Sequence, residues 1–186
     1  IEDKKDDLRD LDIFERSLKV EPNREFITSV YGPRRSGKTF LFYSLFKTLD
    51  GKEVLYLNFD DIQLRDWTSE DIMGSVTMFH EINGKEPETI MLDEIQNVEG
   101  WEKAVRTLYE KKRYGILLTG SSSRLLSKEI STSLRGRSLG YPMLPLSFRE
   151  YLIFLGKKVS IPKTTRSIAD IRTSLDDYLS KGSFPG

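Results

Sequence analysis

The sequence lacks cysteine altogether and contains a single histidine, His80. Without cysteine, disulfide bonds and thiolate metal sites are excluded, and a reducing compartment is permitted. Structural and catalytic zinc is held by several cysteine, histidine or carboxylate side chains, so the lone histidine does not predict a zinc site. We expect the two tryptophans, Trp67 and Trp101, to be packing residues.

Long apolar runs and an excess of charge are also missing. A helix that crosses a bilayer needs about 20 consecutive apolar residues, and the runs here are far shorter. No charged segment followed by an apolar stretch opens the chain as in a signal peptide. The 29 basic residues balance 29 acidic ones, so the overall charge attracts neither DNA nor an anionic membrane. We therefore expect a cytoplasmic protein without a membrane partner.

The 186 residues suffice for one globular domain with a core. Because the chain begins with Ile1 rather than Met, we expect it to be a piece of a longer protein. Short apolar runs alternate with helical patterns, which favours a parallel sheet covered by helices on both faces. The predicted strands cover residues 26–32, 53–59, 89–94, 114–120 and 138–144, and the predicted helices cover residues 3–19, 39–51, 69–82, 99–113, 122–134 and 167–179.

A glycine-rich segment, GPRRSGKT, lies between the first predicted strand and the first long helix after it. Residues 32–39 match the phosphate-loop pattern, in which glycines let backbone N–H groups curl around a polyphosphate at a helix N-terminus. Lys38 supplies a cation for the β- and γ-phosphates, and Thr39 offers a hydroxyl to Mg²⁺. The predicted nucleotide-binding residues are Gly32, Pro33, Arg34, Arg35, Ser36, Gly37, Lys38, Thr39 and Phe40.

Two carboxylates, Asp93 and Glu94, end the third predicted strand in TIMLDE. Ligands of a parallel sheet sit beyond the carboxyl ends of its strands, so this pair is expected to face the phosphate loop. Asp93 is predicted to hold Mg²⁺ together with Thr39, and Glu94 to align and deprotonate the water that attacks the γ-phosphate. Asp60 and Asp61 end the second strand and are either near the metal or a hydrated strand end.

Other sequence features separate the subclasses of nucleotide-binding proteins. Position 96 is Gln rather than the Gly of a GTPase, and no Asn/Thr-Lys-x-Asp base-reading motif occurs. A small-molecule kinase needs no hydrolytic glutamate at position 94. The sequence therefore favours ATP hydrolysis with ATP and Mg²⁺ as cofactors. A binding module gated by ATP with little turnover is the first alternative.

The chain resembles an AAA-type ATPase family of archaea and bacteria. The resemblance runs from about residue 25 to the end and rests on GPRRSGKT, LDEIQNVEGWE, LLTGSSSRLLS, LRGR, PLSFREYL and GSFPG. It implies a P-loop NTPase fold of the additional-strand, catalytic-glutamate type, with a five-stranded parallel sheet in the order 5-1-4-3-2. The expected organisation is an N-terminal helical segment (1–24), the ATPase core (25–145) and a helical extension (146–186) that leads to a C-terminal domain not contained in this sequence.

The resemblance also suggests further catalytic residues. Ser121 occupies the position of a sensor of the γ-phosphate, with Thr119 as the competing candidate and a helix N-cap as the plainer role. Arg137, with Arg135 as the alternative, occupies the place of an arginine supplied in trans to a neighbouring subunit of a homo-oligomer. Both arginines also fit a simple helix C-terminus.

A DNA-processing ATPase is the remaining alternative function. The fold class is compatible with a DNA partner, but the balanced charge does not support one. The basic residues at 111–113 fit a solvated helix end more simply than a DNA contact.

Overall fold

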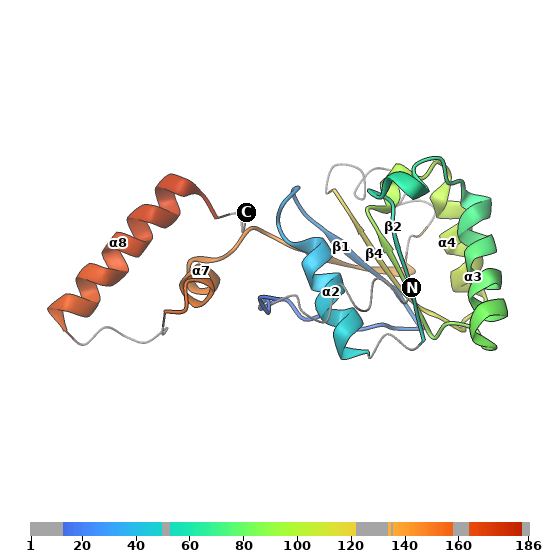
Figure 1. The fold of residues 1–186 in the computed structure, drawn as a ribbon, viewed down its shortest axis with the longest axis horizontal. Helices are drawn as coiled ribbons and strands as arrows, with labels where there is room; N and C mark the ends of the chain where they lie inside the picture. Colours follow the sequence, from blue (N-terminus) through green and yellow to red (C-terminus); the bar gives the residue numbers. More distant parts are fainter. Residues whose placement is uncertain (1–12, 50–52, 122–133, 135, 158–163, 184–186) are drawn as a thin grey trace.

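The computed structural model describes residues 13–49, 53–121, 134, 136–157 and 164–183. Its centre is a sheet of five strands in the order β2-β3-β4-β1-β5 (Figure 1), and every neighbouring pair is parallel. This confirms both the α/β class and the predicted strand order. The strands are β1 (Ile27–Tyr31), β2 (Val54–Asn58), β3 (Thr89–Asp93), β4 (Gly115–Gly120) and β5 (Ser138–Pro142).

Helices cover both faces of the sheet, as the alternating pattern predicts. Helix α2 (Lys38–Thr48) covers one face, while α3 (Ser69–Asn83) and α4 (Trp101–Glu110) cover the other (Figure 1). Successive side chains of β3 point to opposite faces of the sheet, as they do in any strand. Met91 joins the core beneath α2, whereas Ile90 and Leu92 join the larger core beneath α3 and α4.

The chain topology gathers the polar residues of interest at one edge of the sheet. All strands run in the same direction, so their carboxyl ends lie together. Strand β1 ends at Tyr31, directly before the phosphate loop, and pairs with Gly120 at the end of the neighbouring β4. Strand β3, on the other side of β4, ends at Asp93. Two short 3-10 turns, η1 (Ile62–Leu64) and η2 (Ile95–Asn97), follow β2 and β3.

Two further helices, α7 (Phe148–Phe154) and α8 (Thr165–Lys181), lie beyond α2 on the side away from the sheet (Figure 1). Tyr178 of α8 joins them: its ring packs against Phe148 and Tyr151, and its hydroxyl donates a hydrogen bond to the Leu146 carbonyl at 2.8 Å. The PLSFREYL segment therefore packs and redirects the chain, and its Ser147 caps α7 through a reciprocal hydrogen-bonding pair with Glu150.

The predicted helix over residues 3–19 is wrong for the part that the structure describes. Residues 13–19 have no helical structure, and residues 3–12 lie outside the described ranges. Neighbouring residues of this segment serve different partners: the Phe14 ring packs against Phe154 of α7, while Arg16 bonds to Ser36 and Glu150. These tertiary contacts outweigh the helical spacing of the apolar residues. The predicted helix at 122–134 also lies outside the described residues, except for Leu134.

The buried carboxylate of Glu150 makes the fold sensitive to acid. Burial raises its pKa, but hydrogen bonds from Arg16, the Ser17 N–H and Ser147 outweigh that effect and hold the pKa at about 2. Because the folded pKa lies below the ordinary 4.5, Glu150 stabilises the fold above about pH 4.5, and this contribution is lost as the pH falls toward 2.

We expect Glu150→Gln to lower the free energy of unfolding at pH 7 by roughly 2–4 kcal/mol, because Arg16 loses its buried anion. The deficit relative to wild type should shrink as the pH falls from about 5 to 3. Chemical denaturation at a series of pH values measures this. Glu15→Gln, at a solvent-exposed pair with Lys19, is the control and should change stability little. A Glu150→Gln deficit that stays constant with pH would contradict the role assigned to its ionisation.

Within the described ranges, no helix is both long enough and apolar enough to cross a membrane.

Candidate functional site

The phosphate loop follows β1 in a conformation that requires glycine at two positions. A Cβ at Gly32 would lie 2.0 Å from the Met143 carbonyl oxygen, because the end of β5 passes close by and the Met143 N–H donates to the Tyr31 carbonyl at 2.7 Å. Gly37 has φ +94° and forms the N-cap of α2, a left-handed conformation that L side chains rarely adopt. The first turn of α2 has no acidic residue, so its N–H groups are open to an anion.

Lys38, the first residue of α2, is buried together with Glu94. Its Nζ lies 3.2 Å from Glu94 Oε1, and the two side chains are 3% and 9% exposed. The same Nζ donates hydrogen bonds to the carbonyls of Gly32 at 3.3 Å and Pro33 at 3.2 Å. The lysine side chain thus folds back along its own loop. Its positive charge is balanced by the carboxylate of Glu94, which directly follows β3.

The acidic pair is held by hydroxyl groups from neighbouring strands. Asp93 accepts hydrogen bonds from Thr119 of β4, from Tyr56 of β2 at 3.0 Å, and from Thr39 of α2. Thr119 Oγ1 in turn accepts the Glu94 N–H at 2.9 Å. Glu94 has a left-handed backbone with φ 51°, so its side chain turns away from the direction that a continued strand would give it.

Burial and hydrogen bonds act in opposite directions on the pKa of Asp93 in this network. Burial raises the pKa of Asp93, and the charge of Glu94 adds to that, while hydrogen bonds from Thr119, Thr39 and Tyr56 lower it. Burial also raises the pKa of Tyr56, reinforced by the nearby Asp93 charge, so Tyr56 stays neutral and acts as a donor. Gln96 Nε2 donates to Glu94 Oε2 at 2.6 Å, which leaves Glu94 with a partner on each oxygen.

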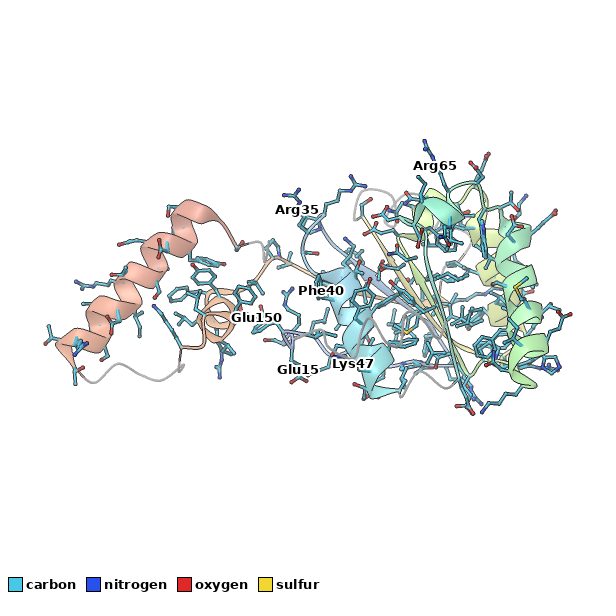
Figure 2. All side chains as sticks on the ribbon, viewed as in Figure 1. Glu15, Arg35, Phe40, Lys47, Arg65 and Glu150 are labelled. Atoms are coloured by element: carbon cyan, nitrogen blue, oxygen red, sulfur yellow. The ribbon has the colours of Figure 1, made fainter. Side chains whose placement is uncertain are left out.

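A cleft of about 550 Å³ opens above the phosphate loop. Rings from the N-terminal segment and from α7 line it together with polar residues of the phosphate loop. Arg35 lies at the turn before α2, and Phe40 lies on α2 (Figure 2), where its ring packs against that of Tyr43. The cleft is lined by Phe14, Arg16, Arg34, Arg35, Gly37, Lys38, Thr39, Phe40, Asp60, Glu94, Leu146 and Phe154.

The structure brings most of the predicted site residues together but places some elsewhere. Ser121 follows β4 and is half-buried, whereas Thr119 is the residue that bonds to both members of the acidic pair. Arg137 precedes β5 at the amino end of the sheet, the edge opposite the phosphate loop, and lies 3.8 Å from Glu110. It therefore does not reach the site of its own chain. Arg135 lies outside the described residues.

Several plainer expectations can also be compared with the structure. Asp60 lines the cleft while its carboxylate accepts a hydrogen bond from Asn97 at 2.9 Å, so it is a strand-end residue close to the site. Trp101 is buried in the main core, and Trp67 packs against Phe59, as expected of packing residues.

The polar residues of the site that were not predicted from the sequence include Arg16, Tyr56 and Gln96. Tyr56 occupies an ordinary apolar strand, VLYLN, in which a tyrosine carries no sign of a polar partner. Gln96 stands two residues after Glu94, and that proximity was the only available signal. Arg16 lies in a segment whose spacing suggested a helix, and nothing local points to the phosphate loop.

The residues at the carboxyl edge fit a magnesium ion. Mg²⁺ prefers oxygen ligands and takes only one or two from the protein when phosphates and water supply the rest. Asp93 and Thr39 provide a carboxylate and a hydroxyl already in contact with each other. Among the described residues, no group of three or more His, Cys, Asp or Glu side chains could hold a metal ion.

The parallel sheet, the phosphate loop and the acidic pair beyond β3 define a P-loop NTPase domain. The chain matches the family described as an AAA domain over residues 24–152, and it belongs to that family. This confirms the family expected from the sequence motifs.

Relatives occur in both archaea and bacteria. A protein of Methanocaldococcus jannaschii is 36% identical over 168 residues, which cover 90% of this chain and 37% of that protein. A Haemophilus influenzae protein is also 36% identical, over 87% of this chain and 40% of that protein. Both carry the name uncharacterized protein, and this chain spans less than half of each.

The fold is similar to Cdc6p from Pyrobaculum aerophilum, with a TM-score of 0.50 and 13% identity over 72% of this chain and 44% of that one.

Proposed function

We propose that this domain binds ATP with Mg²⁺, hydrolyses it to ADP and phosphate, and acts as a switch or motor module for a partner domain. The observation that carries the proposal is the buried contact between Lys38 and Glu94, 3.2 Å apart at the phosphate loop. One residue is suited to a phosphate and the other to a water molecule. The proposal is supported because these two residues lie side by side in the cleft.

The side chains suggest how hydrolysis proceeds. A bound triphosphate offers Lys38 a stronger anionic partner than Glu94, so the lysine turns to the β- and γ-phosphates and releases the carboxylate. Glu94 Oε1 is then free to accept a proton from the attacking water, while Gln96 continues to hold Oε2. Thr39 and Asp93 are the residues that would hold Mg²⁺, which neutralises charge on the phosphates when it is bound.

The shape of the cleft supports a nucleotide rather than a simple polyphosphate. Phe14, Leu146 and Phe154 are among the residues that line it, and the rings of Phe14 and Phe154 pack against each other. Aromatic rings and aliphatic groups are suited to the face of a nucleobase. The proposal is tested by steady-state phosphate release with ATP in Mg²⁺ and in EDTA. Turnover that requires Mg²⁺ supports it. ATP binding with no turnover at any protein concentration would favour the ATP-gated binding module instead.

Two of the three basic residues at 111–113 do not favour a DNA-processing role. Lys112 lies over the Tyr109 ring at 3.7 Å from its centroid, and Arg113 is 3.1 Å from Glu86. Each side chain therefore has a local partner. Stimulation of phosphate release by DNA at a stated salt concentration would overturn this conclusion.

We further predict that Arg137 acts in trans, because it lies at the opposite edge of the sheet from its own phosphate loop. An arginine supplied to the γ-phosphate of a neighbour can raise turnover by about 10³–10⁵-fold. Lys38→Ala and Arg137→Ala should each be nearly inactive, and mixing them should restore part of the activity. In a mixed assembly, an intact phosphate loop can meet an intact Arg137.

Glu110→Ala is the control, since it removes the partner of Arg137 but leaves the arginine. An exposed ion pair of this kind contributes little stability, so this variant should hydrolyse ATP at close to the wild-type rate. Full activity of Arg137→Ala alone would refute the role. So would a lack of recovery between variants that still assemble.

A further inference from the structure

Arg16 is buried against the phosphate loop, in a segment where no local motif predicts a functional residue. Its side chain is 7% exposed, and its guanidinium reaches three separate segments. One nitrogen donates to the Ser36 carbonyl at 2.5 Å, a second to the Leu144 carbonyl at 2.8 Å, and Nε donates to Glu150 Oε1 at 3.0 Å. The planar fork of an arginine is suited to holding several acceptors at once.

The contact with Ser36 fixes the peptide unit that opens α2. The carbonyl of Ser36 and the N–H of Gly37 belong to one planar group, in which they point in opposite directions. Gly37 is the N-cap of α2, with φ +94°. Because glycine has no side chain, no side-chain contact at this position restrains the peptide. A donor that anchors the Ser36 carbonyl therefore also fixes the opposite direction, in which the Gly37 N–H points.

The charge of Arg16 acts in the same direction. A cation bonded to a carbonyl polarises the peptide and strengthens its N–H as a donor, because linked hydrogen bonds reinforce each other. Arg16 lines the same cleft as Gly37 and Lys38. Glu150 orients the guanidinium from the other side, and it also accepts the Ser17 N–H at 2.9 Å, which fixes the backbone next to Arg16.

We propose that Arg16 is a positioning residue of the nucleotide site, which holds the Ser36–Gly37 peptide with its N–H directed at the nucleotide phosphates. The inference rests on the proposed function, because it requires a nucleotide in the cleft. Arg16 acts through the loop backbone, and Glu150 serves it by fixing the guanidinium. If the role were merely structural, Arg16 and Glu150 would contribute equally, as an ion pair that ties the N-terminal segment to α7.

The test compares ADP and ATP binding by calorimetric titration in wild type, Arg16→Gln, Arg16→Lys and Glu150→Gln, at a temperature at which each variant is folded. We expect Arg16→Gln to weaken the binding of both nucleotides about tenfold, as expected for the loss of one charge-assisted contact. Arg16→Lys should recover part of the affinity. Glu150→Gln breaks the same ion pair but leaves the Ser36 contact, and should weaken binding less than about threefold.

Equal losses in Arg16→Gln and Glu150→Gln would overturn the proposal, because the pair would then act only as a tie. Wild-type affinity in Arg16→Gln would overturn it as well. If Arg16→Gln does not fold, the comparison of Arg16→Lys with Glu150→Gln decides in the same way, with the larger loss expected for Arg16→Lys. Failure of the wild type to bind either nucleotide would instead refute the proposed function itself.

Discussion

Glu94→Gln is expected to bind ATP at least as tightly as wild type and to hydrolyse it about 10²–10⁴-fold more slowly, the usual range for the loss of a general base. Gln has nearly the same shape and can still accept a hydrogen bond from Lys38, but it cannot take a proton from water at neutral pH. It also removes a negative charge from beside the phosphates. Affinity should therefore stay the same or rise while turnover falls.

Two measurements on the same preparation check this: equilibrium binding of ATP and steady-state phosphate release. Glu99→Gln is the matched control, because it makes the same chemical change at an exposed position just beyond η2 and should leave both quantities unchanged. Turnover in Glu94→Gln equal to wild type would exclude Glu94 as the base. A large loss of ATP affinity would show that Glu94 serves binding rather than the chemical step.

Lys38→Ala is expected to lose nucleotide affinity by roughly 10–100-fold, since charge-assisted hydrogen bonds to the phosphates disappear, and to lose turnover more completely. The variant also leaves the buried Glu94 without its cation, so the nucleotide-free protein should be less stable than wild type. Excess ATP raises the unfolding temperature only of a protein that binds it. It should therefore stabilise wild type much more than this variant.

Lys47→Ala provides the control for Lys38→Ala. It removes a lysine from the last turn of the same helix, at an exposed position far from the phosphate loop. ATP binding, turnover and thermal stabilisation should all be close to wild type. Normal hydrolysis in Lys38→Ala would mean that residues 32–39 are not a phosphate loop.

The parts of the site that could be predicted from the sequence are local patterns with a single chemical meaning. GPRRSGKT combines the glycines, lysine and hydroxyl that a triphosphate needs within eight positions, and its place between a strand and a helix follows from hydrophobic periodicity. The acids after TIML could be placed beside it because parallel strands end at a common edge. Neither inference needs a contact between distant side chains.

The parts that could not be predicted depend on such contacts. Arg16 and Glu150 are 134 residues apart, and Tyr56 and Asp93 are 37 apart. The sequence around each of these residues therefore does not indicate its partner. The N-terminal segment shows that a local pattern can also predict a structure that does not form. Its apolar spacing suits a helix, yet residues 13–19 are not helical, because both Phe14 and Arg16 contact α7 and Arg16 also bonds to Ser36. Long-range contacts thus explain the error over residues 13–19 and the omission of Arg16 and Tyr56, whereas Gln96 lies only two residues from its partner Glu94.

The exchange of Lys38 between Glu94 and a bound nucleotide can be seen in a crystal structure of this chain with a non-hydrolysable ATP analogue and Mg²⁺. We expect the triphosphate to lie in the loop of residues 32–39 and Lys38 Nζ to leave Glu94 for the β- and γ-phosphates. We also expect the metal to contact Thr39 and to lie next to Asp93. An analogue bound elsewhere, or one bound with the Lys38–Glu94 contact of 3.2 Å intact, would contradict these expectations.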